Sequence, residues 1–195
     1  MPKAATAKSP KVSKPEPRAP TAAPEERIPR RIENPSVDDL FAIVTRAIFQ
    51  AGMSWAAIDA RWEAFRAAFA DFSAREVAAF GDAMTDELML REGIVHSRKK
   101  IAATIANARA LLAIESEFGN FHAYVGQFDS YVALAADLKK RIAYLGDLSV
   151  YYLLFRSGEL VPQFEDWEKT IEGDHPRMRE MIALGRSLGK TSEVP

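Results

Sequence analysis

From Ser36 onward, apolar residues recur at intervals of three and four positions, and this spacing restricts the chain to helices. Residues so spaced lie on one face of an α-helix, whereas a strand needs apolar and polar residues to alternate over a run of about six positions. No segment alternates in this way, and clusters of β-branched residues are lacking. We therefore predict an all-α fold. Spacing and capping residues predict helices over 37–51, 54–69, 97–118, 132–143, 148–157 and 176–188, with shorter ones from 73 and over 86–91, 121–127 and 163–171.

Residues 1–35 differ from the rest of the chain in composition. Eight of the 11 prolines lie there, so we predict a disordered tail that is partly polyproline II, followed by a helical domain over 36–190. The tail carries eight Lys or Arg against four Glu, a net charge of +4, which leaves −5 on the remainder of the chain. A basic arm on an acidic body is typical of polyanion binding. A solvated tail that only keeps the protein soluble fits the same composition.

Several kinds of chemistry are disfavoured by what the sequence lacks. No apolar run reaches the roughly 20 residues of a membrane span and no signal-peptide core begins the chain, so we expect a soluble, cytoplasmic protein without a membrane partner. The absence of Cys excludes disulfides, thiolate nucleophiles and Cys-ligated zinc. Gly-rich phosphate loops and the common hydrolase motifs are missing too. We expect neither a metal nor a cofactor, and expect surface or helix-end positions for the three histidines, His96, His122 and His175.

The turn at 50–55 joins two predicted helices. Gly52 permits a tight reversal, and Ser54 is placed to cap the second helix. Met53 and Trp55 then project from the tip of the turn, where a thioether suits wedging into a base stack and an indole suits stacking on an extruded base. The alternative is that both side chains only fill the core.

Two further turns carry runs of basic residues. The run at 98–100 opens a long helix, where positive charge opposes the helix dipole, and this suggests a compensating contact with phosphate. The run at 139–141 precedes a Gly-containing turn of helix-hairpin-helix type, which presents backbone N–H groups to phosphate. A solvated cationic turn and an ordinary helical hairpin are the alternatives. The candidate DNA contacts are Arg98, Lys99, Lys100, Lys139, Lys140, Arg141, Gly146 and Ser149.

These turns, in this order, resemble the DNA-3-methyladenine glycosylase I family of helix-hairpin-helix DNA glycosylases. The matching stretches, spread over about 36–165, are Gln50–Trp55, Gly93–Ile101, Asn107–Ala110, and Leu138–Arg141 followed by Leu145 and Gly146. The resemblance implies a monomeric DNA repair enzyme that flips a damaged base out of duplex DNA. It also implies hydrolysis of the N-glycosidic bond of an alkylated purine such as 3-methyladenine.

By this resemblance, Trp55 stacks on the base in a pocket shared with Gln50 and the position of Ala47, while Met53 and Gly52 form the wedge. The family has its base-reading Glu where this chain has Ala47. Its zinc site uses two Cys and two His, and the first C-terminal His of that set aligns near Gln163.

Another carboxylate is a candidate to take the role of the base-reading Glu that this chain lacks. Glu165 and Asp166 lie 19 and 20 residues beyond Gly146, and the wider superfamily carries a catalytic Asp after its hairpin. The alternative is an exposed acidic helix start that complements the helix dipole.

Three functions therefore remain open. The first is a working glycosylase with altered pocket chemistry. The second is a catalytically inactive relative that binds distorted or abasic DNA, and the third is a helical interaction domain without a DNA function. The acidic body counts against tight DNA binding, and the salt dependence of binding discriminates among the three.

Overall fold

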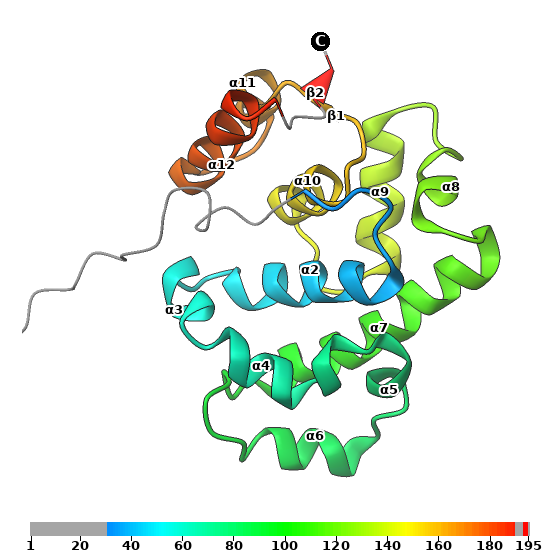
Figure 1. The fold of residues 1–195 in the computed structure, drawn as a ribbon, viewed down its shortest axis with the longest axis vertical. Helices are drawn as coiled ribbons and strands as arrows, with labels where there is room; N and C mark the ends of the chain where they lie inside the picture. Colours follow the sequence, from blue (N-terminus) through cyan, green and yellow to red (C-terminus); the bar gives the residue numbers. More distant parts are fainter. Residues whose placement is uncertain (1–30, 190–192, 195) are drawn as a thin grey trace, which may run out of the picture.

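The computed structural model describes residues 31–189 and 193–194 (Figure 1), so most of the predicted disordered tail lies outside the described residues. The regular secondary structure of the described part is almost entirely helical, as predicted. Its longer helices are α2 (Val37–Gln50), α7 (Arg98–Phe118), α9 (Tyr131–Arg141), α10 (Asp147–Arg156) and α12 (Pro176–Ser187). The shorter elements are α3 (Trp55–Asp59), α4 (Trp62–Ala68), η1 (Ala70–Phe72), α5 (Ala74–Ala78), α6 (Asp82–Leu88), α8 (Phe121–Val125), α11 (Phe164–Trp167) and η2 (Glu168–Thr170).

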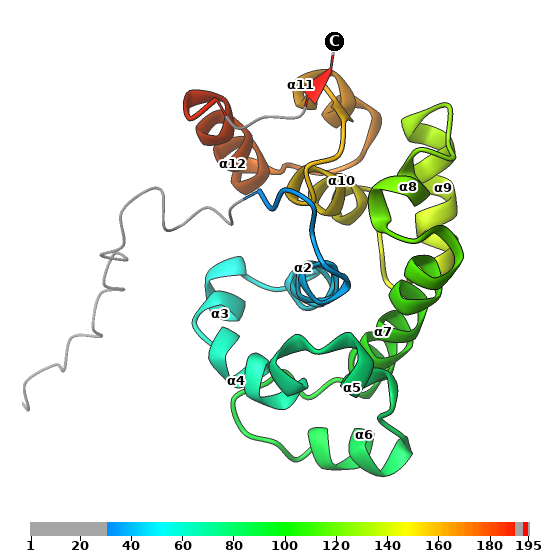
Figure 2. The same cartoon turned by 45° about the vertical axis from the view of Figure 1, so that its right-hand side comes forward.

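Helix α2 is the central element of the fold. Ser36 and Asp39 form a reciprocal capping box that fixes its start, as the sequence signature of a helix N-terminus predicts. The helix packs against α7 on one side and α10 on another, and Figure 2 shows it enclosed between the lower and upper groups of helices. Most of its residues are buried, including the polar Gln50 at its last position. The end of α2 is therefore held rigidly between elements that are distant in sequence.

Helix α7 runs along the lower and right-hand side of the molecule in Figure 1. Ser97 caps its start by accepting a hydrogen bond from the backbone N–H of Lys100. Its buried face packs on α2 and α5. Gly119 ends the helix with a positive φ of 85°, a conformation that favours glycine.

The structure differs from the sequence prediction in the segment 54–69. The predicted single helix is divided into α3 and α4, because Arg61 leaves helical geometry at φ −108° and ψ 4°. After this break the ring of Trp62 stacks on Phe72 and Phe65, with centroids 4.6 and 5.9 Å apart. Packing of Trp62 on Phe72, which lies beyond the predicted helix, explains the change of direction, because helical spacing alone does not encode this contact.

Three smaller differences concern boundaries. The helix predicted over 86–91 is α6, which begins earlier, directly after Gly81. The packed part of the chain begins before Ser36, since the N–H of Ile32 donates to Arg156 O at 2.8 Å and Arg31 donates to Gly158 O at 2.7 Å. Two-residue strands β1 (Val161–Pro162) and β2 (Glu193–Val194) pair in parallel. Within the described residues, no helix is long and apolar enough to cross a membrane.

Candidate functional site

A pocket of about 220 Å³ opens at the junction of α2, α3 and α10. The end of α2 and the turn after it form one side, and the first two turns of α10 form the other. Every described residue that lines it is uncharged. The lining residues are Ala47, Gln50, Ala51, Gly52, Trp55, Leu148, Ser149 and Tyr152.

Two aromatic side chains form a corner of this pocket. The ring of Trp55, at the first position of α3, meets the ring of Tyr152 edge to face, with centroids 5.6 Å apart and planes at 74°. Trp55 is half-buried, which leaves part of its surface accessible, whereas Tyr152 is almost wholly buried. The Tyr152 hydroxyl accepts a hydrogen bond from Nη1 of the buried Arg156 at 2.6 Å. The pocket thus has a partly open indole face beside a fixed tyrosine.

The polar side chain at the base of α2 is Gln50. It is only 5% exposed, it lines the pocket, and its amide forms no hydrogen bond with any described residue. Its amide atoms are not among the buried unpaired polar atoms of the described residues, so they face the open pocket rather than the packed core. An amide in this state has both a donor and an acceptor available to a molecule in the pocket.

The turn between α2 and α3 forms the lip of the pocket. Gly52 has φ +75° and is exposed, as a tight reversal requires. The side chain of Met53 is half-buried against the core rather than fully extended from the turn. Nζ of Lys100 donates to the carbonyl of Ala51 at 2.8 Å, so the start of α7 fastens this lip.

The predicted hairpin between α9 and α10 is present as a short connection over residues 142–146. Its left-handed residue is Tyr144, with φ +61°, whereas Gly146 is extended at the N-cap of α10. A Cβ on Gly146 would meet nothing within 4 Å, and no side chain caps the first amides of α10. The absence of a side chain at Gly146 therefore keeps the approach to those N–H groups open. The backbone conformation of Gly146 is one that any residue adopts.

Asn107 holds this hairpin in place from the middle of α7. Its fully buried amide donates to Ala143 O at 3.0 Å and accepts from Ala143 N at 2.8 Å. Nearby on the same helix, Arg109 donates to the carbonyls of Ala78 and Phe80 and so caps the end of α5. The Asn-Ala-Arg-Ala run, which the chain shares with the family, thus has a structural role here. The sequence pattern alone did not predict this role.

The candidate basic residues fall into two groups. Arg98 pairs with Asp86, Lys139 pairs with Asp147 at 2.7 Å, and Arg141 pairs with Glu117 at 2.9 Å. Hydrogen bonds that Arg141 donates to Glu117 and Asp137 raise the pKa of Arg141 above its ordinary value. Lys99 and Lys140 are exposed and form no ion pair with the described residues.

The two carboxylates considered for catalysis are not at the pocket. Glu165 and Asp166 lie on α11, outside the set of lining residues. Arg186 binds Glu165 through two hydrogen bonds of 2.6 and 2.7 Å, which lower the pKa of Glu165 to about 2, and Asp166 pairs with Lys169. The acidic helix start is the interpretation that the geometry supports.

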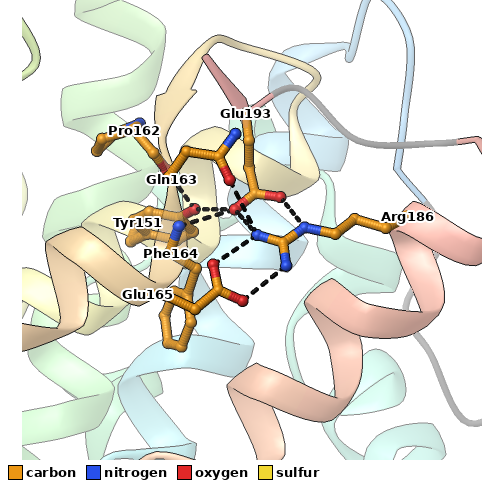
Figure 3. A network of polar contacts seen from close by, with 7 residues as sticks. All are labelled: Tyr151, Pro162, Gln163, Phe164, Glu165, Arg186 and Glu193. Carbon is orange, nitrogen blue, oxygen red and sulfur yellow. Dashed lines mark hydrogen bonds and ion pairs between the residues drawn. The ribbon is translucent and has the colours of Figure 1, made fainter. Parts of the chain in front are cut away.

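Arg186 is the centre of a polar network that joins the C-terminal elements (Figure 3). Besides Glu165, it donates to the carboxylate of Glu193 at 2.6 and 2.7 Å and to Gln163 at 3.2 Å. Gln163 is the position that aligns near a zinc-ligating His of the family. Among the described residues no group of His, Cys, Asp or Glu is suited to hold a metal, so the residues present do not fit that zinc site.

A second cavity of about 240 Å³ lies along α2 and shares no lining residue with the first. Arg46, the residue before Ala47, lines it together with Trp62 and Arg156. The Arg46 guanidinium lies 4.1 Å from the Trp62 ring centroid and 3.2 Å from Asp59, and burial lowers its pKa. Tyr152, which lines the first pocket, is bonded to Arg156, which lines the second.

The histidines are at separate places, as predicted. His96 contacts Arg91 O at 2.7 Å, His122 pairs with Glu159 at 3.0 Å, and His175 contacts Glu172 O at 3.1 Å. None of the three lines the pocket.

The part of the chain that forms the pocket matches a known protein family. A family model described as methyladenine glycosylase matches residues 33–154, a range that contains every residue lining the pocket. The chain belongs to the methyladenine glycosylase family. The prediction from the three turns is therefore confirmed at the level of the family.

Curated relatives of this methyladenine glycosylase family member match over part of their length. The chain is 30% identical over 89 residues to DNA-3-methyladenine glycosylase of Haemophilus influenzae and 36% identical over 89 residues to DNA-3-methyladenine glycosylase 1 of Escherichia coli. Each match covers 46% of this chain, and the chain spans about half the length (48%) of each relative.

Solved structures of the same family share the fold. 3-Methyladenine DNA glycosylase I of Staphylococcus aureus aligns with a TM-score of 0.59 and 27% identity, over 67% of this chain and 80% of that one. A Tyr-to-Phe variant of 3-methyladenine DNA glycosylase I in complex with 3-methyladenine aligns with a TM-score of 0.60 and 26% identity, over 69% of this chain and 83% of that one. The all-α glycosylase fold is thus confirmed.

Sequence reasoning placed Ala47, Gln50 and Trp55 together, and the structure brings all three to one pocket. It missed Tyr152 and the hairpin contact of Asn107. The only sequence signal for Tyr152 is the adjacent pair of tyrosines at 151 and 152, because neighbouring helix positions point about 100° apart and so contact different neighbours.

Proposed function

We propose that this protein binds damaged duplex DNA and hydrolyses the N-glycosidic bond of an alkylated purine such as 3-methyladenine. The observation that carries the proposal is the pocket between α2 and α10, with Trp55 at its mouth. An engineered apolar cavity of about 150 Å³ accommodates benzene, so a pocket of about 220 Å³ suits a bicyclic base. Membership of the family and the relatives named for 3-methyladenine support the reaction class.

The chain supplies the parts that such a reaction needs. Trp55 stacks on the flipped base, and the turn of Gly52 and Met53 enters the gap in the duplex. The uncapped amides of α10 after Gly146 bind a phosphate oxygen. Water adds to C1′ as the C1′–N bond breaks, and the electron pair of that bond stays with the base. With a cationic base the proton of the water goes to solvent, and with an uncharged base it goes to the departing nitrogen.

The test is single-turnover base release from alkylated duplex DNA with excess protein. We expect release of 3-methyladenine by the wild type and a rate about tenfold to a hundredfold lower with Trp55→Ala, the range for loss of one stacking contact. Trp62→Ala is the matched control, because this tryptophan is also half-buried but lies outside the pocket. Absence of release by the wild type with binding to abasic DNA retained would instead support an inactive DNA-binding relative.

DNA binding through phosphates has its own test. Lys99 and Lys140 are exposed and without ion pairs among the described residues, so each is available to a phosphate. We expect Lys99→Ala and Lys140→Ala each to reduce the slope of log K against log salt by about 0.9, the value for one lost phosphate contact. Binding is measured by fluorescence anisotropy on duplex DNA at several salt concentrations. Lys169→Ala, which removes an exposed lysine already paired with Asp166, should leave the slope unchanged. Unchanged slopes for all three variants would remove Lys99 and Lys140 from the interface.

A further inference from the structure

We propose that the pocket favours alkylated purines that carry no charge in DNA over those that are cationic, and that Gln50 is the residue that reads them. This inference rests on the proposed glycosylase function and ranks its substrates: 3-methyladenine, which is cationic in DNA, is accepted less well than an alkylated purine without charge. It follows from the charge of the pocket walls, the charges at the lip and at the start of α10, and the free hydrogen-bonding capacity inside.

The pocket walls offer nothing to hold a cation. All described lining residues are uncharged, and the α2 residue that faces the pocket three positions before Gln50 is Ala47. A cationic base that leaves water for such a pocket loses solvation without gaining a counter-charge. An uncharged base loses less on entry, so the walls alone favour it.

Positive groups lie at the lip of the pocket and at the start of α10. Lys100 donates to the carbonyl of Ala51 at the lip. The uncapped start of α10 adds the positive end of a helix dipole beside Leu148 and Ser149. The acidic group nearest in sequence to these two is Asp147, which is neutralised by its ion pair with Lys139. Arg46 is likewise paired with Asp59. A positive charge on the base is therefore opposed from two sides.

Gln50 supplies the recognition that charge does not. The residue is only 5% exposed and lines the pocket, and its amide forms no hydrogen bond with a described residue. A neutral purine presents acceptor nitrogens on its edges, and the amide NH₂ donates to one of them. When a base fills the pocket, this hydrogen bond gives the amide a partner in place of water, so the amide is not left unsatisfied.

The experiment compares two alkylated purines in otherwise identical duplexes. One contains 7-methylguanine, which is cationic, and the other contains 1,N6-ethenoadenine, which is uncharged. The measured quantity is the single-turnover release rate divided by the spontaneous rate of the same duplex. For the wild type we expect this rate enhancement to be at least about tenfold greater for the uncharged base, the order of effect of one unfavourable charge in a partly buried site.

Gln50→Glu places a carboxylate in the same volume and is expected to reverse the preference at pH 8. The rate enhancement on 7-methylguanine should rise and that on 1,N6-ethenoadenine should fall, each by about tenfold. Gln127→Glu is the matched control, since Gln127 is exposed on a different part of the surface and its change should alter neither rate. Circular dichroism and a melting curve report whether each variant is folded.

The outcomes separate the two proposals. An equal or larger enhancement on the cationic base by the wild type overturns the charge preference while leaving the glycosylase function intact. This comparison needs no variant, so it holds even where Gln50→Glu fails to fold. A wild-type protein that releases neither base, nor 3-methyladenine, overturns the glycosylase function and the charge preference with it.

Discussion

Replacing Asn107 with leucine is expected to lower the free energy of unfolding by about 2–3 kcal/mol. Asn107 is fully buried and makes two hydrogen bonds to the backbone of Ala143, 36 residues away in sequence. Leucine has a similar volume but leaves the N–H and C=O of Ala143 without these partners. Urea denaturation followed by circular dichroism measures the change.

Thr104→Val on the same helix is the control for this prediction. Thr104 is also fully buried, but its hydroxyl donates to Lys100 O within α7, a carbonyl that the helix itself already uses. We expect a loss below about 1 kcal/mol, because no long-range contact is broken. Equal losses for both variants would show that Asn107 contributes only burial. Because Asn107 fixes the hairpin before α10, Asn107→Leu should also weaken DNA binding at temperatures where the protein is folded.

The sequence predicted most helices because their signals are local. Ser36 and Ser97 precede helical spacing, and each caps its helix as expected. The prediction of one helix over 54–69 was wrong because the packing of Trp62 on Phe72 breaks the helix. Spacing within the segment does not reveal this contact. The start of α6 was misplaced since Gly81 gives a weak capping signal compared with Ser or Asp.

The candidate site was predicted in part for a similar reason. Ala47, Gln50 and Trp55 follow one another within nine residues, so a single motif placed them together. Tyr152 and Asn107 act through α10 and the hairpin, and their positions depend on how α10 and α7 pack on α2. The basic runs were predicted as one group, yet Arg98, Lys139 and Arg141 are engaged in ion pairs. Local composition identifies charge but not the partner that neutralises it.

Replacing Arg186 with alanine is expected to destabilise the C-terminal part of the domain by about 2–4 kcal/mol. This is somewhat less than the roughly 3–5 kcal/mol for loss of one partner of a fully buried ion pair, because Arg186 itself is partly exposed. The reason for the destabilisation is the burial of its partner. The Glu193 carboxylate has a side-chain exposure of 1% and receives two of the Arg186 hydrogen bonds, and Glu165 and Gln163 receive the others. This network joins β1, α11, α12 and β2 without a metal ligand set among the described residues, so the chelator EDTA should leave the melting temperature unchanged.

Arg179→Ala is the matched control, because Arg179 lies on the same helix and also pairs with two carboxylates, Glu168 and Asp174, but at the surface. Its loss should cost less than about 1 kcal/mol. The pH dependence separates the variants further. Since Arg186 lowers the pKa of Glu165 to about 2, below the ordinary value of 4.5, this pair stabilises the protein above about pH 4.5 and ceases to do so as the pH falls toward 2. Melting curves between pH 7 and pH 2 should therefore show the smallest acid-induced decrease for Arg186→Ala. Arg179→Ala should stay closer to the wild type, because the pKa of Asp174 that Arg179 lowers belongs to an exposed carboxyl. Parallel decreases in all three proteins would show that Arg186 does not couple Glu165 to the fold.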